Sequence, residues 1–497
     1  MGSPLKQAHK YPFLNYLFLG LAGALSTLSF SPFNIKLTII FSLIILIYTV
    51  TNATNSIEAL KRSFAWGLGY WISGTGWLIV SIYFYGNTYL ITSILLILLM
   101  GILLSLVFIA PISLIKLLIF NKNIFVYSML FASFLTILEL SRFVLLGGFP
   151  WLLPGLTMLD TFGQFLMPII GVYGLSFIIY FLSAFIALSF IYKQSLYFFS
   201  AILCLFIFFP QNNIQQEYSG ESMKVAIIQP SLDPFKKFKE EETINIEKTL
   251  LDLSTKHLNA ELIIWPESPF PYLNSSPEMR SLLLKLGNVK LGNAPIVISG
   301  AWEYQNNELF NSLTILGSNQ SYFKRHLVPF GEFVPFESII RGLIDFFDLP
   351  MSSTSAGIPK QELFDIEGFN VLGMICFDVA FPLSFLDETR NADFIINVSN
   401  DTWFGSSYGP YQHLQIVRAR ALESNKWILR GTSDGISTIV DNKGTIVELL
   451  SKGIRGSLSG KVYKVDNPSY FHKIGYLIIP LLSIFVFTVA IILRFIL

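Results

Sequence analysis

Three side chains with complementary chemistry follow apolar runs in the second half of the chain. Glu267 comes directly after the run at 262–265 and Pro266, Lys324 follows Tyr322-Phe323, and Cys376 ends the run at 369–375. A thiol with a pKa of about 8.5 must lose its proton before it attacks a carbonyl group. A carboxylate can take that proton, and an ammonium group stabilises the thiolate and the oxyanion that follows. Together they predict acyl transfer through a thioester.

Each of these residues also has a purely structural interpretation. A single cysteine at the end of a strand is more often part of the core than a nucleophile. Glu267 suits a turn cap, and Lys324 suits an exposed strand position. The joint occurrence of the three residue types is what favours catalysis. Glu332 adds a second carboxylate after Lys324, and the N–H of Phe377 is positioned to complete an oxyanion hole if a helix begins there.

Composition excludes several other kinds of site. The 497 residues carry a net charge of +1, so we expect no nucleic-acid partner. The two cysteines, Cys204 and Cys376, offer neither a disulfide framework nor a thiolate metal site, and the five histidines lack ligand spacing. We therefore expect no metal and no cofactor.

The elements that must position the three residues follow an α/β pattern. The stretch 240–258 has the spacing of an amphipathic helix that begins with acidic residues. Five apolar runs are typical of buried strands: 225–228, 262–265, 296–298, 369–375 and 394–398. Reactive groups in such sheets gather at the strand ends.

The remainder of the chain is that of a membrane protein. Hydrophobic residues make up 53% of the chain, charged residues only 13%, and the mean hydropathy is +0.57. We expect a transmembrane domain at 1–210, an extramembrane domain at 211–472 and a last helix at 473–497. The eight expected spans lie at about 12–30, 37–52, 63–84, 89–119, 124–146, 165–191, 195–209 and 475–496.

Lysine and arginine are concentrated in alternate loops, and this bias places both termini in the cytoplasm. The domain at 211–472 then lies outside the cytoplasm. There Cys376 would meet an oxidising compartment without a partner for a disulfide.

Two segments suggest contacts with lipid. Phe149 and Trp151 lie in a Gly- and Pro-rich loop that suits either an interfacial turn or a floor beneath the outer domain. Arg142 nearby suits either a phosphate headgroup or the water interface. Phe346 and Phe347 precede a Ser-rich stretch, which suits either a loop folded on its own domain or a mobile lid that touches lipid.

Glu267, Lys324 and Cys376 in these contexts resemble the Glu-Lys-Cys triad of the nitrilase, or carbon–nitrogen hydrolase, superfamily, which implies an αββα sandwich. Three longer motifs resemble the bacterial apolipoprotein N-acyltransferase family. They are the segment from Lys324 to Pro335, the segment from Val398 to Gly405, and Gly148-Phe149-Pro150-Trp151. The resemblance covers nearly the whole chain.

This resemblance implies an activity and a role for each matching residue. Glu267 would be the general base, Lys324 the oxyanion stabiliser, Cys376 the nucleophile and Glu332 a second essential carboxylate. Trp403 and, less clearly, Asn311 match residues near the family's site. Where the family commonly has Cys-Tyr-Glu, this chain has Cys376-Phe377-Asp378, which leaves the role of Asp378 open.

The implied partners are a phospholipid acyl donor, a diacylglyceryl-apolipoprotein acceptor and membrane lipid, with a monomeric enzyme in the bacterial inner membrane and its catalytic domain in the periplasm. Two alternatives remain. One is a membrane-tethered amidase that uses the same triad. The other is a transporter or receptor whose outer domain only binds ligand, which the scarcity of charges within the spans disfavours.

Overall fold

The computed structural model describes residues 12–86, 88–118, 123–211, 218–233, 235, 239–289, 295–334 and 353–496. The chain forms two compact units, which are described separately. The first contains residues 1–79, 89–213 and 474–497, and the second contains 80–88 and 214–473. The segment Val80–Thr88, whose first residues were expected in the third span, thus belongs to the second unit.

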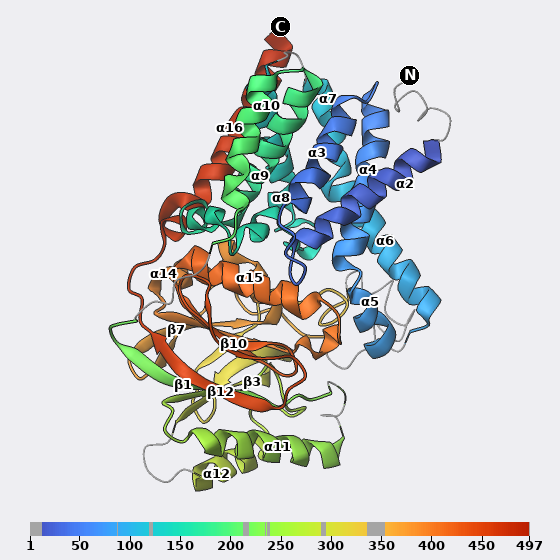
Figure 1. The fold of residues 1–497 in the computed structure, drawn as a ribbon. Coiled ribbons are helices and arrows are strands. Elements are labelled where there is room, and N and C mark those ends of the chain that lie inside the picture. The colour runs from blue at the N-terminus through green and yellow to red at the C-terminus, as the bar shows by residue number, and fades with distance from the viewer. Residues whose placement is uncertain are drawn as a thin grey trace. The chain divides into compact units, whose positions relative to one another are not determined.

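The first unit is helical (Figure 1). Its helices are α2 (Pro12–Leu25), α3 (Thr38–Thr51), α4 (Ser56–Thr75), α6 (Leu90–Phe108), α7 (Ile115–Leu118), α8 (Ile124–Ser141), α9 (Met167–Ile191), α10 (Ser195–Cys204) and α16 (Tyr476–Ile496). The helices α8 and α9 pack along each other, as do α2 and α4. Asn55 begins α4 by accepting a hydrogen bond from the N–H of Glu58 at 2.9 Å.

Four apolar helical stretches in the described residues are long enough to cross a membrane: Leu90–Leu118, Ile124–Ser141, Phe162–Ile191 and Phe471–Ile492. Three shorter apolar helices lie at Phe13–Ser29, Thr38–Thr51 and Ser195–Phe208. The structure therefore supports four candidate spans, and the full set of eight stays a prediction.

The second unit is built on two six-stranded sheets. The first has the order β12-β1-β2-β3-β4-β5, and the second has the order β11-β10-β9-β8-β7-β6. In each sheet the three central strands are parallel and the outer strands are antiparallel. The strands of the first sheet are β1 (Ser222–Gln229), β2 (Leu262–Ile264), β3 (Ile296–Gln305), β4 (Glu308–Ile315), β5 (Ser321–Phe323) and β12 (Gly456–Tyr463). Those of the second are β6 (Phe364–Ile366), β7 (Phe369–Ile375), β8 (Phe394–Ser399), β9 (Trp427–Thr432), β10 (Ser437–Val440) and β11 (Ile446–Leu450).

The two sheets pack face to face, with helices on their outer sides (Figure 1). Gly431 on β9 lies so close to the first sheet that a Cβ atom there would be 3.1 Å from the side chain of Ile264. The outer helices are α11 (Glu240–Ser254) and α12 (Pro277–Val289) on the first sheet, and α14 (Leu386–Asn391) and α15 (Gly409–Ser424) on the second. This is the expected αββα sandwich, and the five expected strands all lie in its parallel core.

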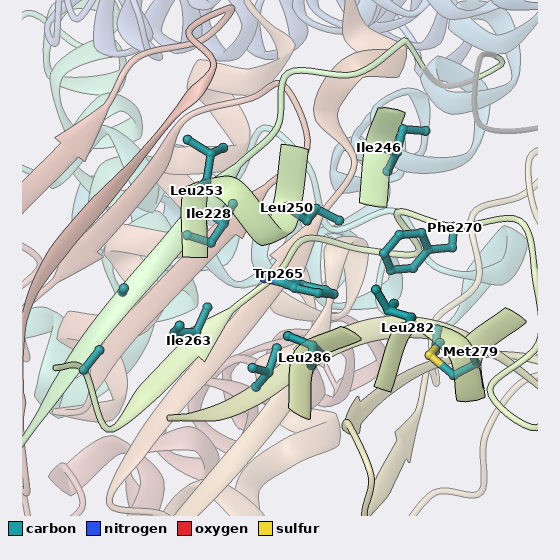
Figure 2. Packing of buried hydrophobic residues seen from close by; sticks show 14 residues of the cluster. Ile228, Ile246, Leu250, Leu253, Ile263, Trp265, Phe270, Met279, Leu282 and Leu286 are labelled. Carbon is teal, nitrogen blue, oxygen red and sulfur yellow. The ribbon is translucent and has the colours of Figure 1, made fainter. Parts of the chain in front are cut away.

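A buried cluster fixes the outer helices to the first sheet (Figure 2). Ile263 and Trp265 point from the sheet toward Leu250 of α11 and Leu282 of α12. The indole N–H of Trp265 donates to the hydroxyl of Ser254 at 3.0 Å. Because Trp265 lies two residues before Glu267, this cluster also anchors the turn that carries the expected base.

Two leucines on α12 provide a matched test of this packing. Leu282 is fully buried, whereas the side chain of Leu284 is 71% exposed. Leu282→Ala should lower the free energy of unfolding by about 2–5 kcal/mol, because it leaves a cavity in the cluster. Thermal unfolding of the full-length protein in detergent should therefore show a lower Tm for Leu282→Ala and an unchanged Tm for Leu284→Ala. Equal Tm values for the two variants would show that α12 is not held by this cluster.

Candidate active site

Glu267 is held at the end of β2 by a close approach of two backbones. A Cβ atom on Gly300 of β3 would lie 2.2 Å from the backbone nitrogen of Ser268 and 2.7 Å from Cα of Glu267. Ser268 has a φ of 37°, so the turn is also strained. Only glycine at position 300 lets the turn lie against the neighbouring strand, and this packing sets where the carboxylate points.

Lys324 bridges two carboxylates in the interior of the unit. Its Nζ lies 3.3 Å from Oε1 of Glu267 and 2.8 Å from Oε1 of Glu332. The side chain of Lys324 is only 1% exposed, and each glutamate side chain is 9% exposed. Removing one partner from such a buried pair leaves an uncompensated charge, which costs about 3–5 kcal/mol. The geometry therefore depends on all three residues.

Asn311 on β4 joins the same two carboxylates from another side. Its Nδ2 donates to Oε1 of Glu267 at 2.8 Å and to Oε1 of Glu332 at 3.0 Å. The hydroxyl of Ser268 donates to Oδ1 of Asn311 at 3.0 Å, which fixes the orientation of the amide. Asn311, the site residue that the resemblance indicated least clearly, thus lies at the centre of the cluster.

Backbone groups occupy the remaining carboxylate oxygens. The N–H of Asn400 donates to Oε2 of Glu267 at 2.8 Å, and the N–H of Val328 donates to Oε2 of Glu332 at 2.8 Å. Both glutamates are therefore held in a single orientation before any substrate arrives. Such preorganisation is what an active site needs, since no reorientation has to occur during the reaction.

Cys376 follows β7 on a sharp turn. Its φ of 49° lies in the left-handed region, which is unfavourable for a residue with a side chain. The next residues form a short 3₁₀ helix at Cys376–Ala380, so a helix does begin at the position expected for the oxyanion donor.

Asp378 stabilises this turn from the inside. Its carboxylate accepts hydrogen bonds from the N–H of Ile375 at 3.0 Å, the N–H of His326 at 2.8 Å and the hydroxyl of Tyr322 at 2.9 Å. Tyr322 and His326 flank Lys324 in sequence. Asp378 therefore ties the segment that carries the ammonium group to the turn that carries the thiol, even though its arm is shorter than that of the family's usual Glu.

Burial and the charges of the site together keep the thiol of Cys376 protonated at rest. Burial, and next the charge of Glu267, raise the pKa of Cys376 to about 12, against the opposing effect of Lys324. Burial alone would lower the pKa of Lys324, but Glu267 and Glu332 raise it well above its usual value. A neutral thiol beside a fixed carboxylate and a permanent cation calls for a base that removes the proton during the attack.

Trp403 lies in an aromatic cluster of the second unit. Its ring centroid lies 5.5 Å from that of Tyr85 and 5.4 Å from that of Phe235, and both contacts are edge-to-face. The hydroxyl of Ser81 donates to the carbonyl of Trp403 at 2.7 Å. The segment Val80–Thr88 therefore supports the turn at 399–404, and this turn also supplies Asn400 to Glu267.

The other expected residues lie elsewhere or have other contacts. The ring of Phe377 packs edge-to-face on Phe381, with centroids 4.9 Å apart. In the first unit, Phe149 and Trp151 stack with ring centroids 6.2 Å apart. Phe346 and Phe347, the expected lid, lie outside the described residues.

Arg142 is buried in the first unit. It lies over the ring of Trp71 at 4.8 Å and donates to the carbonyl of Trp151 at 3.3 Å. Only 2% of Arg142 is exposed. The guanidinium group therefore stabilises the loop at 147–155, and a contact of Arg142 with a headgroup stays a prediction.

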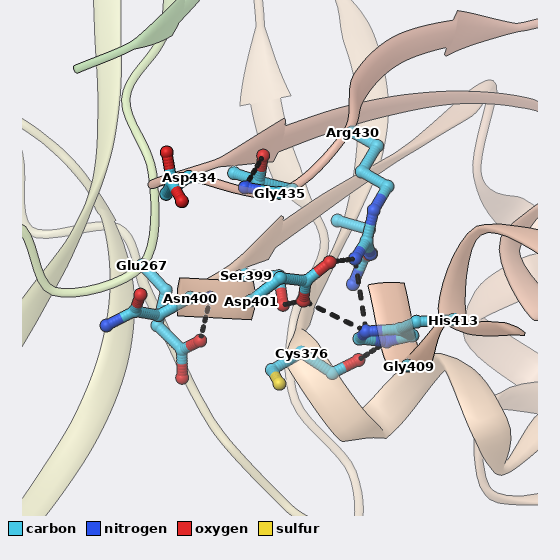
Figure 3. Close-up of polar contacts among 12 residues, drawn as sticks. Glu267, Cys376, Ser399, Asn400, Asp401, Gly409, His413, Arg430, Asp434 and Gly435 are labelled. Atoms are coloured by element: carbon cyan, nitrogen blue, oxygen red, sulfur yellow. Dashed lines mark hydrogen bonds and ion pairs between the residues drawn. The ribbon is translucent and has the colours of Figure 1, made fainter. Parts of the chain in front are cut away.

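Sequence reasoning missed a polar network behind Cys376 (Figure 3). Asp401, buried at the turn after β8, contacts Ser399, His413 and Arg430, and His413 also contacts the carbonyl of Cys376. The available signal was a charged residue within an apolar run: Arg430 interrupts the strand at 427–432, and a buried charge needs a partner. Among the described residues, no group of three His, Cys, Asp or Glu side chains is arranged to hold a metal ion.

The protonation state of Cys376 gives a prediction for its reactivity. With a pKa of about 12, alkylation by iodoacetamide should be slow at neutral pH and should rise about tenfold per pH unit up to pH 9. Glu267→Gln removes a nearby negative charge, so it should lower the thiol's pKa and speed alkylation at a given pH. Mass spectrometry of the Cys376 peptide after timed quenching measures both rates. A rate that already levels off near pH 7 would mean that the resting site holds a thiolate.

The close approach at Gly300 gives a second prediction, with a control on α12. Gly300→Ala should displace the turn of Glu267 and reduce acyl transfer by about 100-fold or more, since small misplacements of catalytic groups have effects of this size. Gly287→Ala adds a methyl group where nothing lies within 4 Å, and activity should be retained. Comparison of initial rates for the two variants tests this, and equal rates would contradict the role of Gly300.

Comparisons with known proteins extend over both units. Residues 22–185 match the family model described as the apolipoprotein N-acyltransferase N-terminal domain, and residues 224–463 match the carbon-nitrogen hydrolase model. An apolipoprotein N-acyltransferase of Pseudomonas syringae pv. tomato is 32% identical and aligns over 91% of each chain. One from Haemophilus ducreyi is 33% identical over 93% of each chain, and one from Shewanella oneidensis is 30% identical over 95% of this chain and 94% of that one. The chain therefore belongs to the apolipoprotein N-acyltransferase family.

Proposed function

We propose that this enzyme acylates lipoproteins: it takes an acyl chain from a membrane phospholipid and passes it to the α-amino group of an S-diacylglyceryl-cysteine at a lipoprotein's N-terminus. The observation that carries the proposal is Lys324 held between Glu267 and Glu332 beside Cys376, in a chain that aligns over 91% of its length with an apolipoprotein N-acyltransferase. We expect no metal and no cofactor in this reaction.

In the first half of the reaction, Glu267 accepts the thiol proton as Sγ of Cys376 attacks the phospholipid's ester carbonyl. The tetrahedral oxyanion is stabilised by the ammonium group of Lys324 and the N–H of Phe377. When the oxyanion collapses, the ester C–O bond breaks and the proton passes from Glu267 to the lysophospholipid oxygen. The acyl chain is then a thioester on Cys376.

In the second half, the uncharged amine of the lipoprotein attacks the thioester carbonyl. Glu267 accepts a proton from the nitrogen, an oxyanion forms at the same place, and the C–S bond breaks as the amide forms. The sulfur then recovers its proton from Glu267. Because the same groups serve both halves, the site returns to its starting state after one transfer.

The membrane setting follows from the substrates. Exposing an acyl chain to water costs about 0.8 kcal/mol for each CH₂ group, so both substrates are best met at a bilayer surface. The four candidate spans and the shorter apolar helices support an enzyme embedded in the bacterial inner membrane. The proposed topology has eight spans, cytoplasmic termini and a periplasmic catalytic unit, in a monomer.

Excluding water separates this activity from that of an amidase with the same triad. A thioester that water reaches is hydrolysed, whereas one that is shielded survives until the amine arrives. Of the site's own groups, Lys324 is 1% exposed and Glu267 is 9% exposed, whereas Cys376 is partly accessible and would depend on the bound acyl chain for shielding.

The acyl-enzyme gives the decisive experiment for the proposed function. When the purified protein is incubated with phospholipid and no acceptor, its intact mass should increase by one acyl chain, and hydroxylamine should reverse the increase. Cys376→Ser should show no hydroxylamine-sensitive adduct, whereas Cys204→Ser should behave as the wild type. Release of free fatty acid without a stable adduct would instead favour the amidase.

A further inference from the structure

The network behind Cys376 contains charged groups that the proposed reaction does not use. Asp401 and Arg430 are buried, and Nη2 of Arg430 lies 2.7 Å from Oδ2 of Asp401. Arg430 also donates to the side-chain oxygen of Asn397, and the hydroxyl of Ser399 donates to Oδ1 of Asp401 at 2.6 Å. Desolvating such a pair is costly, so its retention beside the nucleophile calls for an explanation.

His413 connects this ion pair to the nucleophile. Its Nδ1 lies 3.1 Å from Oδ1 of Asp401 and 3.1 Å from Nη2 of Arg430. Its Nε2 lies 3.2 Å from the carbonyl oxygen of Cys376 (Figure 3). The imidazole therefore spans the distance between the ion pair and the backbone of the catalytic turn.

The partners of the two ring nitrogens define the tautomer of His413. A carbonyl oxygen only accepts hydrogen bonds, so Nε2 must carry a hydrogen to bond with Cys376. Nδ1 then has a lone pair toward the guanidinium N–H of Arg430, and its contact with Asp401 is the one unfavourable pairing left. The opposite tautomer would donate from Nδ1 to Asp401, but it would place two acceptors together at Cys376 and two donors together at Arg430.

The charge state of the ring agrees with this choice. Burial, and next the positive charge of Arg430, lower the pKa of His413, and together they outweigh the opposing effect of Asp401. A neutral ring has one N–H, and the carbonyl of Cys376 is the acceptor for it. In turn, burial alone would raise the pKa of Asp401, but the charge of Arg430 holds it well below its usual range.

Holding this carbonyl has a consequence for the oxyanion site. The carbonyl of Cys376 and the N–H of Phe377 belong to the same planar peptide unit, in which they point in opposite directions. A hydrogen bond that fixes one therefore fixes the direction of the other. Cys376 adopts an unfavourable left-handed conformation, with a φ of 49°, so the turn needs an external contact of this kind.

We propose that His413 is a positioning residue: as the Nε2–H tautomer favoured by the Cys376 carbonyl and by Arg430, it holds that carbonyl and thereby aims the N–H of Phe377 at the oxyanion. The expected effect on acylation rests on the proposed function, whereas the tautomer of His413 and its hydrogen bond to Cys376 do not. The buried Asp401–Arg430 pair then contributes to the reaction through His413, although neither residue contacts the substrate.

The test compares two reactions of the same thiol. Acylation by phospholipid passes through an oxyanion, whereas alkylation by iodoacetamide does not. His413→Leu should slow acyl-enzyme formation at saturating phospholipid by about 10–100-fold, since loss of one oxyanion donor has an effect of this order or more. Alkylation of Cys376 at pH 8 should change by no more than about threefold, because sulfur exposure and charge are retained.

Two further variants complete the comparison. His413→Gln places an amide N–H near the position of Nε2 and should recover most of the acylation rate. His257→Leu removes another hydrogen-bonded histidine, which contacts the hydroxyl of Ser457, and should leave both rates unchanged. If His413→Leu slows both reactions equally, or if His413→Gln gives no rescue, the positioning role is contradicted.

A readout independent of activity separates this inference from the proposed function. In the full-length protein labelled with ¹⁵N-histidine, the resonances lost in His413→Gln identify His413. Their shifts should be those of a neutral Nε2–H ring, and a charged ring or the Nδ1–H tautomer would overturn the inference. If the wild type forms no acyl adduct, the proposed function fails, whereas these shifts still decide the tautomer.

Discussion

The whole site depends on one buried cation. Lys324 is the positive charge between Glu267 and Glu332, and all three side chains are shielded from water. One positive and two negative charges leave a net negative charge, which Asn311 and two backbone N–H groups partly offset. Without the ammonium group the two carboxylates could not lie this close in such surroundings.

Burial of the thiol, together with this excess negative charge, explains why the nucleophile waits as a thiol. A thiolate would add another anion to the cluster, so the neutral form is favoured until a substrate carbonyl arrives. During the attack the negative charge moves to the substrate oxygen, where Lys324 and a backbone N–H can meet it. The site therefore stabilises the oxyanion of the transition state better than it stabilises a thiolate at Cys376. The Asp401–Arg430 pair is neutral overall, although the nearby charge of Asp401 also contributes to the raised pKa of Cys376.

The sequence allowed the parallel core to be predicted because its strands are continuous apolar runs, as at 369–375, where the expected limits and those of β7 coincide. Two other strands were harder to predict. The edge strand β11 is mostly exposed, and β9, although it belongs to the parallel core, includes Arg430, so neither is a continuous apolar run. The third expected span, 63–84, shows another limit: its last residues, from Val80 on, belong to the second unit. There Ser81, and Tyr85 just after the expected span, contact Trp403, and hydropathy does not report such contacts.

For the site, residue chemistry and motif resemblance pointed to Glu267, Lys324, Cys376 and Glu332, which the fold brings into one cluster. Contacts that depend on three-dimensional placement, such as the bridge by Asn311 or the bond from His413 to a carbonyl, have no such signal in the sequence.

The central claim, a neutral thiol beside a buried ammonium–dicarboxylate cluster, can be observed directly. Infrared spectra of the wild type minus those of Cys376→Ser isolate the S–H stretch of Cys376 from that of Cys204. The band should be present at pH 7 and should persist to at least pH 9, given a pKa of about 12. Its absence at pH 7 would show a resting thiolate and would contradict the account.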